Sequence, residues 1–220
     1  MNNRIFLVAA HPLEFKEIRK RLKMKRLPVG VSARSVFKEI PIELGLTGVG
    51  EQAVRQNLPL IFSKRQNLPR CVLNFGLAGA LNSQIKLRDW ILVDEVKSFR
   101  SNSKPIRLGS TPFFKSASEF FSGSAYPFHR GPLITAEEPV TNSGHKNLFR
   151  KTRALAVDME AYPLLETASE FNVPVLCLKI ISDYADQNGE KTLKRIRHKL
   201  VSDIADLVFD LLTFLETKTV

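Results

Sequence analysis

Hydrophobic residues along the chain alternate between continuous apolar runs and segments with helical spacing. The continuous runs, which are typical of strands buried on both faces, cover residues 4–10, 71–75, 90–96 and 173–181. The segments with apolar residues three or four positions apart, which predict helices, cover residues 14–25, 51–63, 157–171 and 191–218. Residues 36–46 alternate at every second position, which predicts a strand or a hairpin.

This order of elements predicts the fold class. Strands that are apolar on both faces and separated by helices indicate a sheet covered on both sides. We therefore expect a three-layer α/β/α fold around a central mixed, mostly parallel twisted sheet. Residues 98–130 are rich in Ser, Pro, Gly and Phe, and their apolar residues show neither helical nor strand spacing. We therefore expect a long irregular insertion there. No repeat or linker divides the sequence, which predicts a single domain over residues 1–220.

Net charge is the unusual feature of the composition. Among 220 residues, 33 Lys and Arg oppose 22 Asp and Glu, giving a formal charge of +11. Such a balance is compatible with an anionic partner. However, twelve of the basic residues lie in two helix-like segments, Lys16–Arg26 and Lys191–Lys199, and such runs are usually solvated helix faces. Because no helix-turn-helix, zinc-finger or aromatic-rich RNA motif is present, we expect no nucleic-acid partner and keep a polyanion binder as the alternative.

Several other classes of protein are disfavoured. The apolar runs are far shorter than the roughly 20 residues that a membrane-spanning helix needs, so no membrane partner is expected. The N-terminal segment matches a signal peptide poorly, and its pattern favours a buried strand. Cys71 and Cys177 each lie in an apolar run and form neither a disulfide framework nor a metal cluster. We expect two reduced core thiols, a cytoplasmic protein, and no metal or cofactor.

Three carboxylates lie just after predicted strands or in the first turn of a predicted helix. Each of the three also has a purely structural explanation. Glu14 could be a first-turn carboxylate that a helix dipole stabilises, Glu160 could cap a helix, and Asp183 could be an ordinary N-cap. Ligands of open α/β sheets bind beyond the carboxyl ends of the strands, where these three side chains would converge. Cleavage of a glycosidic bond needs a set of this kind, because one acid protonates the leaving group and another carboxylate activates water.

Two sequence strings carry a family resemblance. Residues 157–161 (Val-Asp-Met-Glu-Ala) and 180–186 (Ile-Ile-Ser-Asp-Tyr-Ala-Asp) resemble the signature of the nucleoside phosphorylase/nucleosidase superfamily. The chain is similar to the methylthioadenosine/S-adenosylhomocysteine nucleosidase group, also at residues 48–50 and 74–79. Order and spacing agree over most of residues 4–216, except in the segment 98–130. The resemblance implies a nucleoside phosphorylase-like fold and a small nucleoside as the partner of the protein.

The resemblance also implies roles for individual residues. Asp183 is similar to the general acid that protonates the purine N7, and Ser182 would hold it. Glu160 is similar to the carboxylate that binds the ribose hydroxyls, with Met159 beneath the sugar. Glu14 is similar to the base that orients the attacking water. The remaining residues implied in substrate binding are Ala78, Gly79, Val140 and Lys179.

The sequence departs from the family pattern around the base and the nucleophile. Leu77 stands in place of a serine, Pro139 in place of an aromatic residue, and Lys179 in place of an arginine. These changes leave open altered specificity or loss of activity. The Gly-Leu-Ala-Gly loop at residues 76–79 also resembles futalosine hydrolase, which stays an alternative.

The resemblance favours water over phosphate as the nucleophile. Asn74 stands where phosphorylases of this superfamily carry a phosphate-binding arginine, and the loop 11–14 lacks the second one. We therefore expect a hydrolase, with a phosphorylase as the alternative. Members of the superfamily are oligomers, so a homodimer or higher homo-oligomer is expected. The Phe-rich segment 113–121 would suit a contact between subunits.

Overall fold

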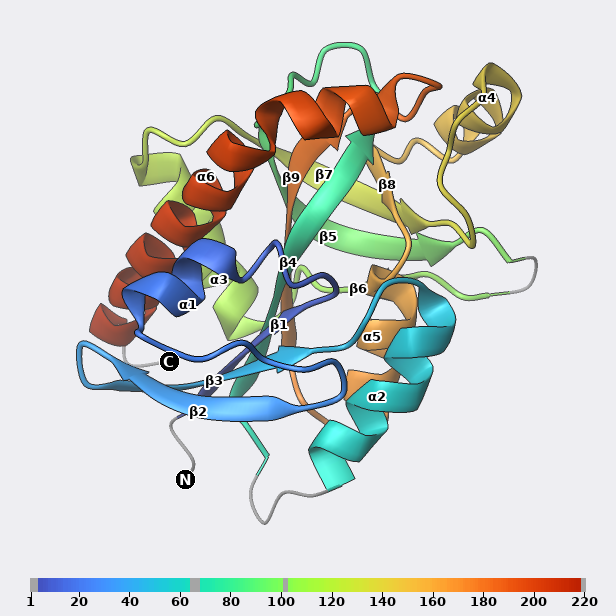
Figure 1. The fold of residues 1–220 in the computed structure, drawn as a ribbon. Coiled ribbons are helices and arrows are strands. Elements are labelled where there is room, and N and C mark those ends of the chain that lie inside the picture. Colours follow the sequence, from blue (N-terminus) through green and yellow to red (C-terminus); the bar gives the residue numbers. More distant parts are fainter. Residues whose placement is uncertain (1–3, 64–67, 101–102, 219–220) are drawn as a thin grey trace.

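The computed structural model describes residues 4–63, 68–100 and 103–218, and a twisted nine-stranded sheet forms its centre (Figure 1). The strands are β1 (Ile5–Ala9), β2 (Ser32–Phe37), β3 (Ile40–Leu46), β4 (Cys71–Ala80), β5 (Trp90–Ser98), β6 (Ile106–Arg107), β7 (Phe128–Thr135), β8 (Ala156–Asp158) and β9 (Val175–Asp183). They follow the order β2-β3-β1-β4-β8-β7-β5-β6, and β9 pairs with both β4 and β5. The double pairing of β9 closes β4, β8, β7 and β5 into a ring.

Both parallel and antiparallel pairs occur in this sheet. Parallel pairing joins β1 to β3 and β4, β4 to β9, and β7 to β5 and β8. Antiparallel pairing joins β2 to β3, β4 to β8, and β5 to β6 and β9. The central strands β1 and β4 are buried along almost their whole length, as their continuous apolar sequences predict.

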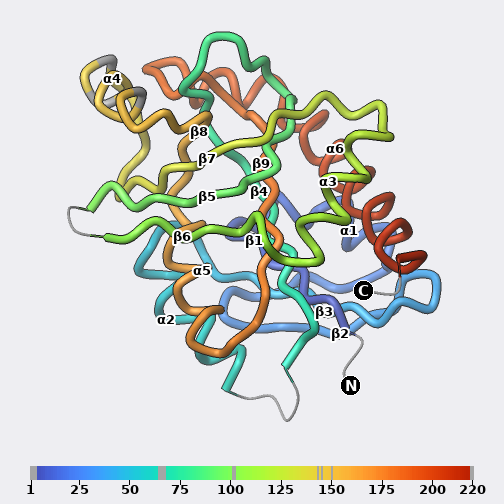
Figure 2. The backbone as a smooth tube through the Cα atoms, turned by 180° about the vertical axis from the view of Figure 1, so that it is seen from behind, coloured from blue at the N-terminus to red at the C-terminus, as the bar shows by residue number. Residues whose placement is uncertain are grey.

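Helices cover the two faces of the sheet and make the fold three-layered. They are α1 (Lys16–Arg21), α2 (Glu51–Ser63), α3 (Pro112–Gly123), α4 (Ser143–Lys151), α5 (Ala161–Glu170) and α6 (Gly189–Thr217). On one face α1 and α3 each contact α6, while α2 and α5 pack together on the other, and α4 lies apart from both groups (Figures 1 and 2). The predicted fold class is therefore confirmed. In the part of the chain that the structure describes, no helix is both long and apolar enough to cross a membrane.

The core contains both cysteines and most of the aromatic side chains of the central strands. Cys71 and Cys177 are buried free thiols, as the sequence predicts. The rings of Phe15 and Phe75 meet edge to face with centroids 5.3 Å apart, so the segment after β1 is fastened onto β4. This contact fixes the backbone next to Glu14.

The predicted irregular insertion over residues 98–130 is wrong. The structure has β6, α3 and the start of β7 in its described part. Thr111 caps α3 by accepting a hydrogen bond from the backbone N–H of Phe114. Phe113 and Phe120, and likewise Phe114 and Phe121, lie seven positions apart, which is about two turns of a helix, and all four are buried in the chain's own core. The Phe-rich segment is therefore not an exposed surface for a subunit contact.

Three predicted ends of helices or strands also differ from those in the structure. The helix expected over 14–25 is only α1, and it ends before Lys23, whose φ of 53° is left-handed. The strand expected to end at Phe75 continues to Ala80 through two glycines, because β4 is hydrogen-bonded to neighbours along its whole length. The helix expected from residue 157 begins at Ala161, because residues 156–158 form β8 between β4 and β7.

Gly45 in β3 gives a direct test of core packing. A Cβ at this position would lie 2.5 Å from Cζ of Phe6, which is fully buried. We expect Gly45→Ala to lower the free energy of unfolding by about 1–3 kcal/mol through overpacking, measured by urea denaturation. Gly123→Ala is the control, because nothing lies within 4 Å of an added Cβ there, and it should change stability by less than about 0.5 kcal/mol. Equal effects of the two substitutions would contradict this packing.

Candidate functional site

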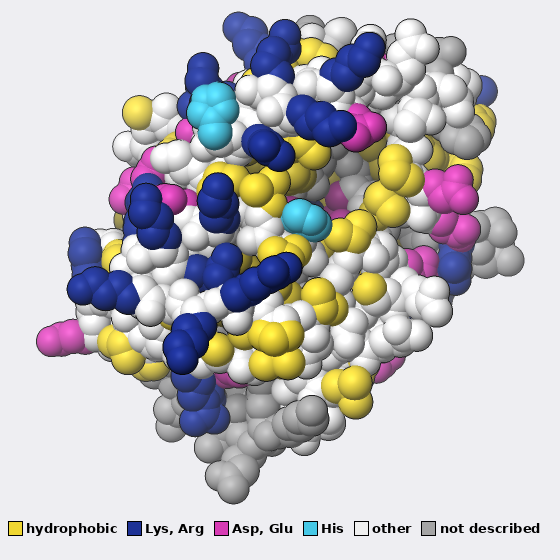
Figure 3. Space-filling model, viewed as in Figure 1, with side chains coloured by type: hydrophobic (Ala, Val, Ile, Leu, Met, Phe, Trp, Pro, Cys, Tyr) yellow, Lys and Arg dark blue, Asp and Glu magenta, His cyan; other side chains and the backbone are white. Residues whose placement is uncertain are grey.

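A cavity of about 610 Å³ opens where β1, β4, β8 and β9 end and α6 begins. This volume is typical of a pocket for a small organic ligand. Its lining contains the predicted catalytic carboxylates Glu14, Glu160 and Asp183. The other predicted residues that line it are Ala78, Gly79, Val140, Met159 and Ser182. Chain segments far apart in the sequence therefore meet at one place, and Figure 3 views this side of the molecule.

Glu14 is buried and held by three backbone amides. Its Oε2 accepts hydrogen bonds from the N–H groups of Ala10 (3.0 Å) and His11 (2.9 Å), and its Oε1 accepts one from Leu77 (2.9 Å). Burial raises the pKa of Glu14 above its ordinary value, although the amide of His11 and the charge of Lys179 oppose this shift. The carboxylate is thus fixed in position and still basic enough to accept a proton.

Glycine at position 76 makes room for this carboxylate. A Cβ there would lie only 2.5 Å from Oε1 of Glu14. Gly76 lies inside β4 and not in a turn after it, so its role is close approach of backbone and carboxylate. Gly79 has the same role beside the third carboxylate, since its Cβ would lie 2.9 Å from Oδ1 of Asp183.

Glu160 lies at the start of α5, with its side chain directed to another loop. Its Oε1 accepts a 2.7 Å hydrogen bond from the N–H of Gly50. Burial and the nearby charge of Asp158 raise the pKa of Glu160 to about 7, against the opposing charge of Lys179. The carboxyl group is therefore held at the cavity wall and changes its charge near neutral pH.

Asp183 ends β9 and is oriented by two neighbours. The hydroxyl of Ser182 donates a 2.7 Å hydrogen bond to Oδ2, and the N–H of Ala185 donates one of 2.8 Å to Oδ1. The same hydroxyl lies 3.3 Å from the carbonyl oxygen of Ala78 in β4. The Asp183 carboxyl group is thus anchored to the end of the sheet and lies at the cavity.

A buried ion pair lies beneath these carboxylates. Nζ of Lys179 is 2.9 Å from Oδ2 of Asp158, and the two side chains are 3% and 0% exposed. The same carboxylate accepts hydrogen bonds from the hydroxyl of Thr135 (2.7 Å) and the N–H of Ala161 (2.9 Å). Burial alone would lower the pKa of Lys179, but Asp158 and Glu160 outweigh it, and the pKa lies above its ordinary value. Lys179 is therefore a positively charged group inside the core.

The structure separates Lys179 from the other residues predicted to bind substrate. It is 2% exposed and does not line the cavity, because its ammonium group points to Asp158. Sequence reasoning missed Asp158, although it lies inside the string that carries the resemblance. It also assigned no role in the site to His11, Val49 or Leu193, which line the cavity from three different segments. No spacing pattern marks these last three, because only the folded chain brings them together.

Two of the three substituted positions of the family pattern also lie at the cavity. Leu77 and Pro139 both line it. The backbone N–H of Leu77 is bonded to Glu14, so the serine-to-leucine change removes a hydroxyl but keeps this contact. Among the described residues, no group of three or more His, Cys, Asp or Glu side chains is arranged to hold a metal ion.

The comparisons with known proteins identify the family. The pattern of the Phosphorylase superfamily matches residues 4–213, and the chain belongs to this superfamily, as predicted. The 5'-methylthioadenosine/S-adenosylhomocysteine nucleosidase of Staphylococcus aureus (strain JH9) is 21% identical to it over 179 residues, which cover 74% of this chain and 78% of that protein.

Two solved structures show how closely the fold is shared. The 5'-methylthioadenosine/S-adenosylhomocysteine nucleosidase of Helicobacter pylori aligns with a TM-score of 0.83 and 19% identity, over 97% of this chain and 99% of that one. The futalosine hydrolase of Helicobacter pylori strain 26695 aligns with a TM-score of 0.82 and 20% identity, over 96% and 97%. The architecture of this chain is thus the one found in both enzymes.

Removing one partner of the buried ion pair should be costly. We expect Lys179→Met to lower the free energy of unfolding by about 3–5 kcal/mol, because Asp158 would be left as an unpaired buried charge. The double variant Lys179→Met/Asp158→Asn carries neither charge and should regain most of this loss. Urea denaturation of the wild type, both single variants and the double variant measures the coupling. Strictly additive losses would show that the two groups do not interact.

Proposed function

We propose that this protein is a nucleosidase that hydrolyses the N-glycosidic bond of a purine nucleoside. The observation that carries the proposal is the charge of the cavity. Glu14, Glu160 and Asp183 line it, and no Lys or Arg occurs among its described lining residues. The negative charge of the lining would repel a phosphate dianion, and the described lining offers no guanidinium group to bind it. Water is neutral and is not repelled. This favours hydrolysis over the phosphorolysis that gives the superfamily its name.

Asp183 is the proposed general acid. In its protonated form it would give its proton to N7 of the purine as the bond between C1′ and N9 breaks. The electron pair of that bond goes to the base, which then leaves as a neutral molecule. The hydrogen bond from Ser182 and the one from the backbone of Ala185 support this role, because they hold the carboxyl group in one orientation.

Glu160 is the proposed ribose carboxylate. As the base leaves, C1′ and the ring oxygen of the sugar become positively charged, and a nearby anion stabilises this charge. The ionised carboxylate would also accept hydrogen bonds from the ribose hydroxyls. Met159 lies beside it in the cavity lining and would pack against the sugar.

Glu14 is the proposed base. Water attacking C1′ must lose a proton, and Glu14 would accept it, which leaves the sugar with a new hydroxyl at C1′. Three backbone hydrogen bonds fix the position of the carboxylate before substrate arrives. Burial, which raises the pKa of Glu14, makes the group a better proton acceptor.

The proposed substrates are 5′-substituted adenine nucleosides of the 5′-methylthioadenosine and S-adenosylhomocysteine type. The sequence and structural likeness to nucleosidases of this name supports the choice. Futalosine is the second candidate, because the futalosine hydrolase of Helicobacter pylori is equally similar in fold. Val49 and Leu193 are apolar side chains of the cavity lining and would contact the 5′ substituent.

The first test is release of free base with and without phosphate. We expect adenine from 5′-methylthioadenosine, or hypoxanthine from futalosine, at a rate that added phosphate does not change. Chromatography of the products measures both base and sugar. Cleavage only in the presence of phosphate would replace the proposal with a phosphorylase.

Asp183→Asn should keep the fold and lose turnover. Asparagine has the same shape but no acidic proton to give, so we expect kcat to fall by about 10²- to 10⁴-fold. The matched control is Asp94→Asn, because Asp94 lies in β5 outside the cavity lining and pairs with Arg130. Turnover of the control should stay within about twofold of the wild type. Undiminished turnover of Asp183→Asn would remove this residue from its role.

The raised pKa of Glu160 predicts the acid side of the pH profile. The carboxylate must be ionised to stabilise positive charge, and a raised pKa means that it takes up a proton at higher pH than an ordinary Glu. Because the pKa of Glu160 is about 7, kcat/KM should begin to decrease as the pH drops below neutral. For a Glu with an ordinary pKa, the decrease would begin only in more acidic solution. A profile of kcat/KM from acid to neutral pH measures this, and a flat profile down to about pH 5 would contradict it.

A further inference from the structure

Two basic segments far apart in the sequence lie side by side in the fold. Helix α1 packs against α6, where Nη2 of Arg21 is 2.6 Å from Oδ1 of Asp206 and its guanidinium lies 5.7 Å from the ring centroid of Phe209. Both helices begin beside the cavity, because Glu14 just before α1 and Leu193 near the start of α6 both line it. The basic residues of the two helices are thus brought to one side of the molecule.

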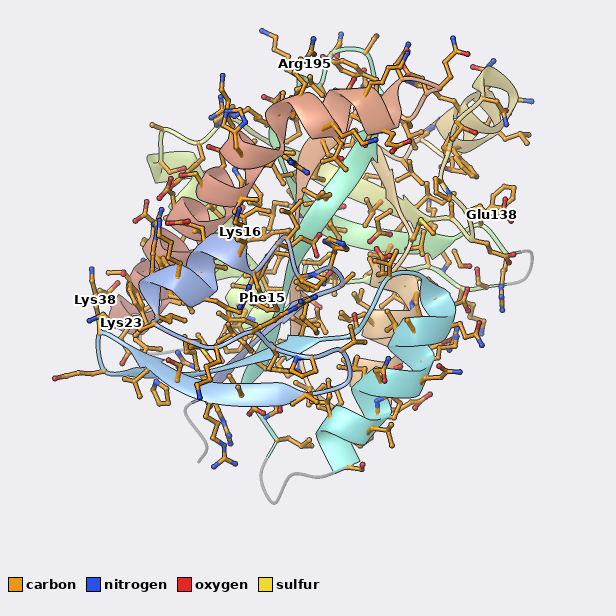
Figure 4. All side chains as sticks on the ribbon, viewed as in Figure 1. Phe15, Lys16, Lys23, Lys38, Glu138 and Arg195 are labelled. Atoms are coloured by element: carbon orange, nitrogen blue, oxygen red, sulfur yellow. The ribbon has the colours of Figure 1, made fainter. Side chains whose placement is uncertain are left out.

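We call a set of eight basic residues, which lie in α1, just after α1 and in the first part of α6, the α1–α6 basic surface. They are Lys16, Arg19, Lys20, Lys23, Lys191, Lys194, Arg195 and Lys199, all exposed except Arg19, which is half-buried. Figure 3 shows Lys and Arg side chains gathered over these two helices. Figure 4 places Lys16 at the start of α1, Lys23 beyond the end of α1, and Arg195 above the first part of α6. The surface therefore extends across both helices.

Acidic residues compensate little of this charge. Within the described ranges, the ion pairs of this surface are Lys20 with Glu17 at 3.7 Å and Lys194 with Glu190 at 2.6 Å. Three carboxylates of α6 bind partners that are not among these eight basic residues. Asp203 binds Arg88, Asp206 binds Arg21, and Asp210 accepts a hydrogen bond from Tyr126. A surplus of positive charge therefore remains on the α1–α6 basic surface.

We propose that the α1–α6 basic surface binds a chain of phosphate groups, such as the backbone of a nucleic acid. Repeated Lys and Arg side chains on adjacent helices match the repeated charges of such a chain and gain affinity by releasing its counterions. An anionic membrane fits less well, because membrane-bound helices also present apolar side chains. Among the described residues, none of the large hydrophobic side chains that are exposed belongs to α1 or α6.

The sequence alone indicates no nucleic-acid partner, because each basic segment by itself resembles a solvated helix face. The packing of α1 against α6 changes this, since it joins the two segments into one surface. The proposed binding does not depend on the proposed nucleosidase activity, because the basic side chains of this surface lie outside the cavity lining.

Fluorescence anisotropy with a labelled single-stranded RNA and a labelled DNA duplex tests the proposal on the full chain. We expect binding that weakens steeply with salt, at about 0.7–0.9 units of log K per log salt for each phosphate contact. The variant Lys191→Gln/Arg195→Gln/Lys199→Gln should lower affinity by about tenfold or more and reduce the salt slope by about 2–3. Lys16→Gln/Lys23→Gln should act in the same direction, because it removes charge from the start of α1 and from the residue just beyond its end.

The control variant is Lys104→Gln/Lys115→Gln/Lys151→Gln, which removes the same charge from exposed residues outside α1 and α6. It should keep the affinity of the wild type, and circular dichroism checks that all variants are folded. Excess inorganic polyphosphate should displace the RNA, because it presents the same repeated charges, whereas binding of polyphosphate with no binding of RNA or DNA would overturn a nucleic-acid backbone as the ligand. Equal losses in the two triple variants would overturn the proposal. So would binding only to phosphatidylserine vesicles, or no binding at low salt.

Discussion

The candidate site depends on one buried positive charge. Lys179 lies in β9 with its ammonium group 2.9 Å from Asp158, and its charge also opposes protonation of Glu14 and Glu160. Carboxylates gathered in a partly buried cavity repel each other and favour taking up protons. The ammonium group offsets part of this repulsion without entering the cavity, so the cavity keeps room for a neutral ligand and a water molecule.

Strand ends and glycines supply the second constraint. Glu14 follows β1, Asp158 ends β8, and Asp183 ends β9, so the sheet itself sets the spacing of these groups. The two glycines of β4 let the carboxylates approach its backbone, because a Cβ at Gly76 or Gly79 would lie within 2.9 Å of a carboxylate oxygen. A rigid scaffold of this kind preorganises charge and lowers the reorganisation that a reaction requires.

The sequence predicted the fold class and the meeting of three carboxylates, because continuous apolar strands and strand-end residues follow simple rules of burial and topology. It did not predict the pairing of Lys179 with Asp158, which requires β8 and β9 to flank β4 in space. It missed β8 because three residues are too few to show a period, and it missed α3 because Ser, Pro and Gly around the phenylalanines suggested a loop. The sequence likewise did not predict that α1 packs against α6, so it could not show that their basic residues share one surface.

The central claim is that water, directed by a carboxylate-lined cavity, cleaves the nucleoside. Turnover of 5′-methylthioadenosine and of futalosine in ¹⁸O-labelled water, followed by mass spectrometry of the sugar product, measures this directly. We expect one ¹⁸O atom in the sugar, introduced at C1′, both with and without phosphate in the buffer. An unlabelled sugar phosphate as the product would contradict it, because phosphate and not water would then have attacked C1′.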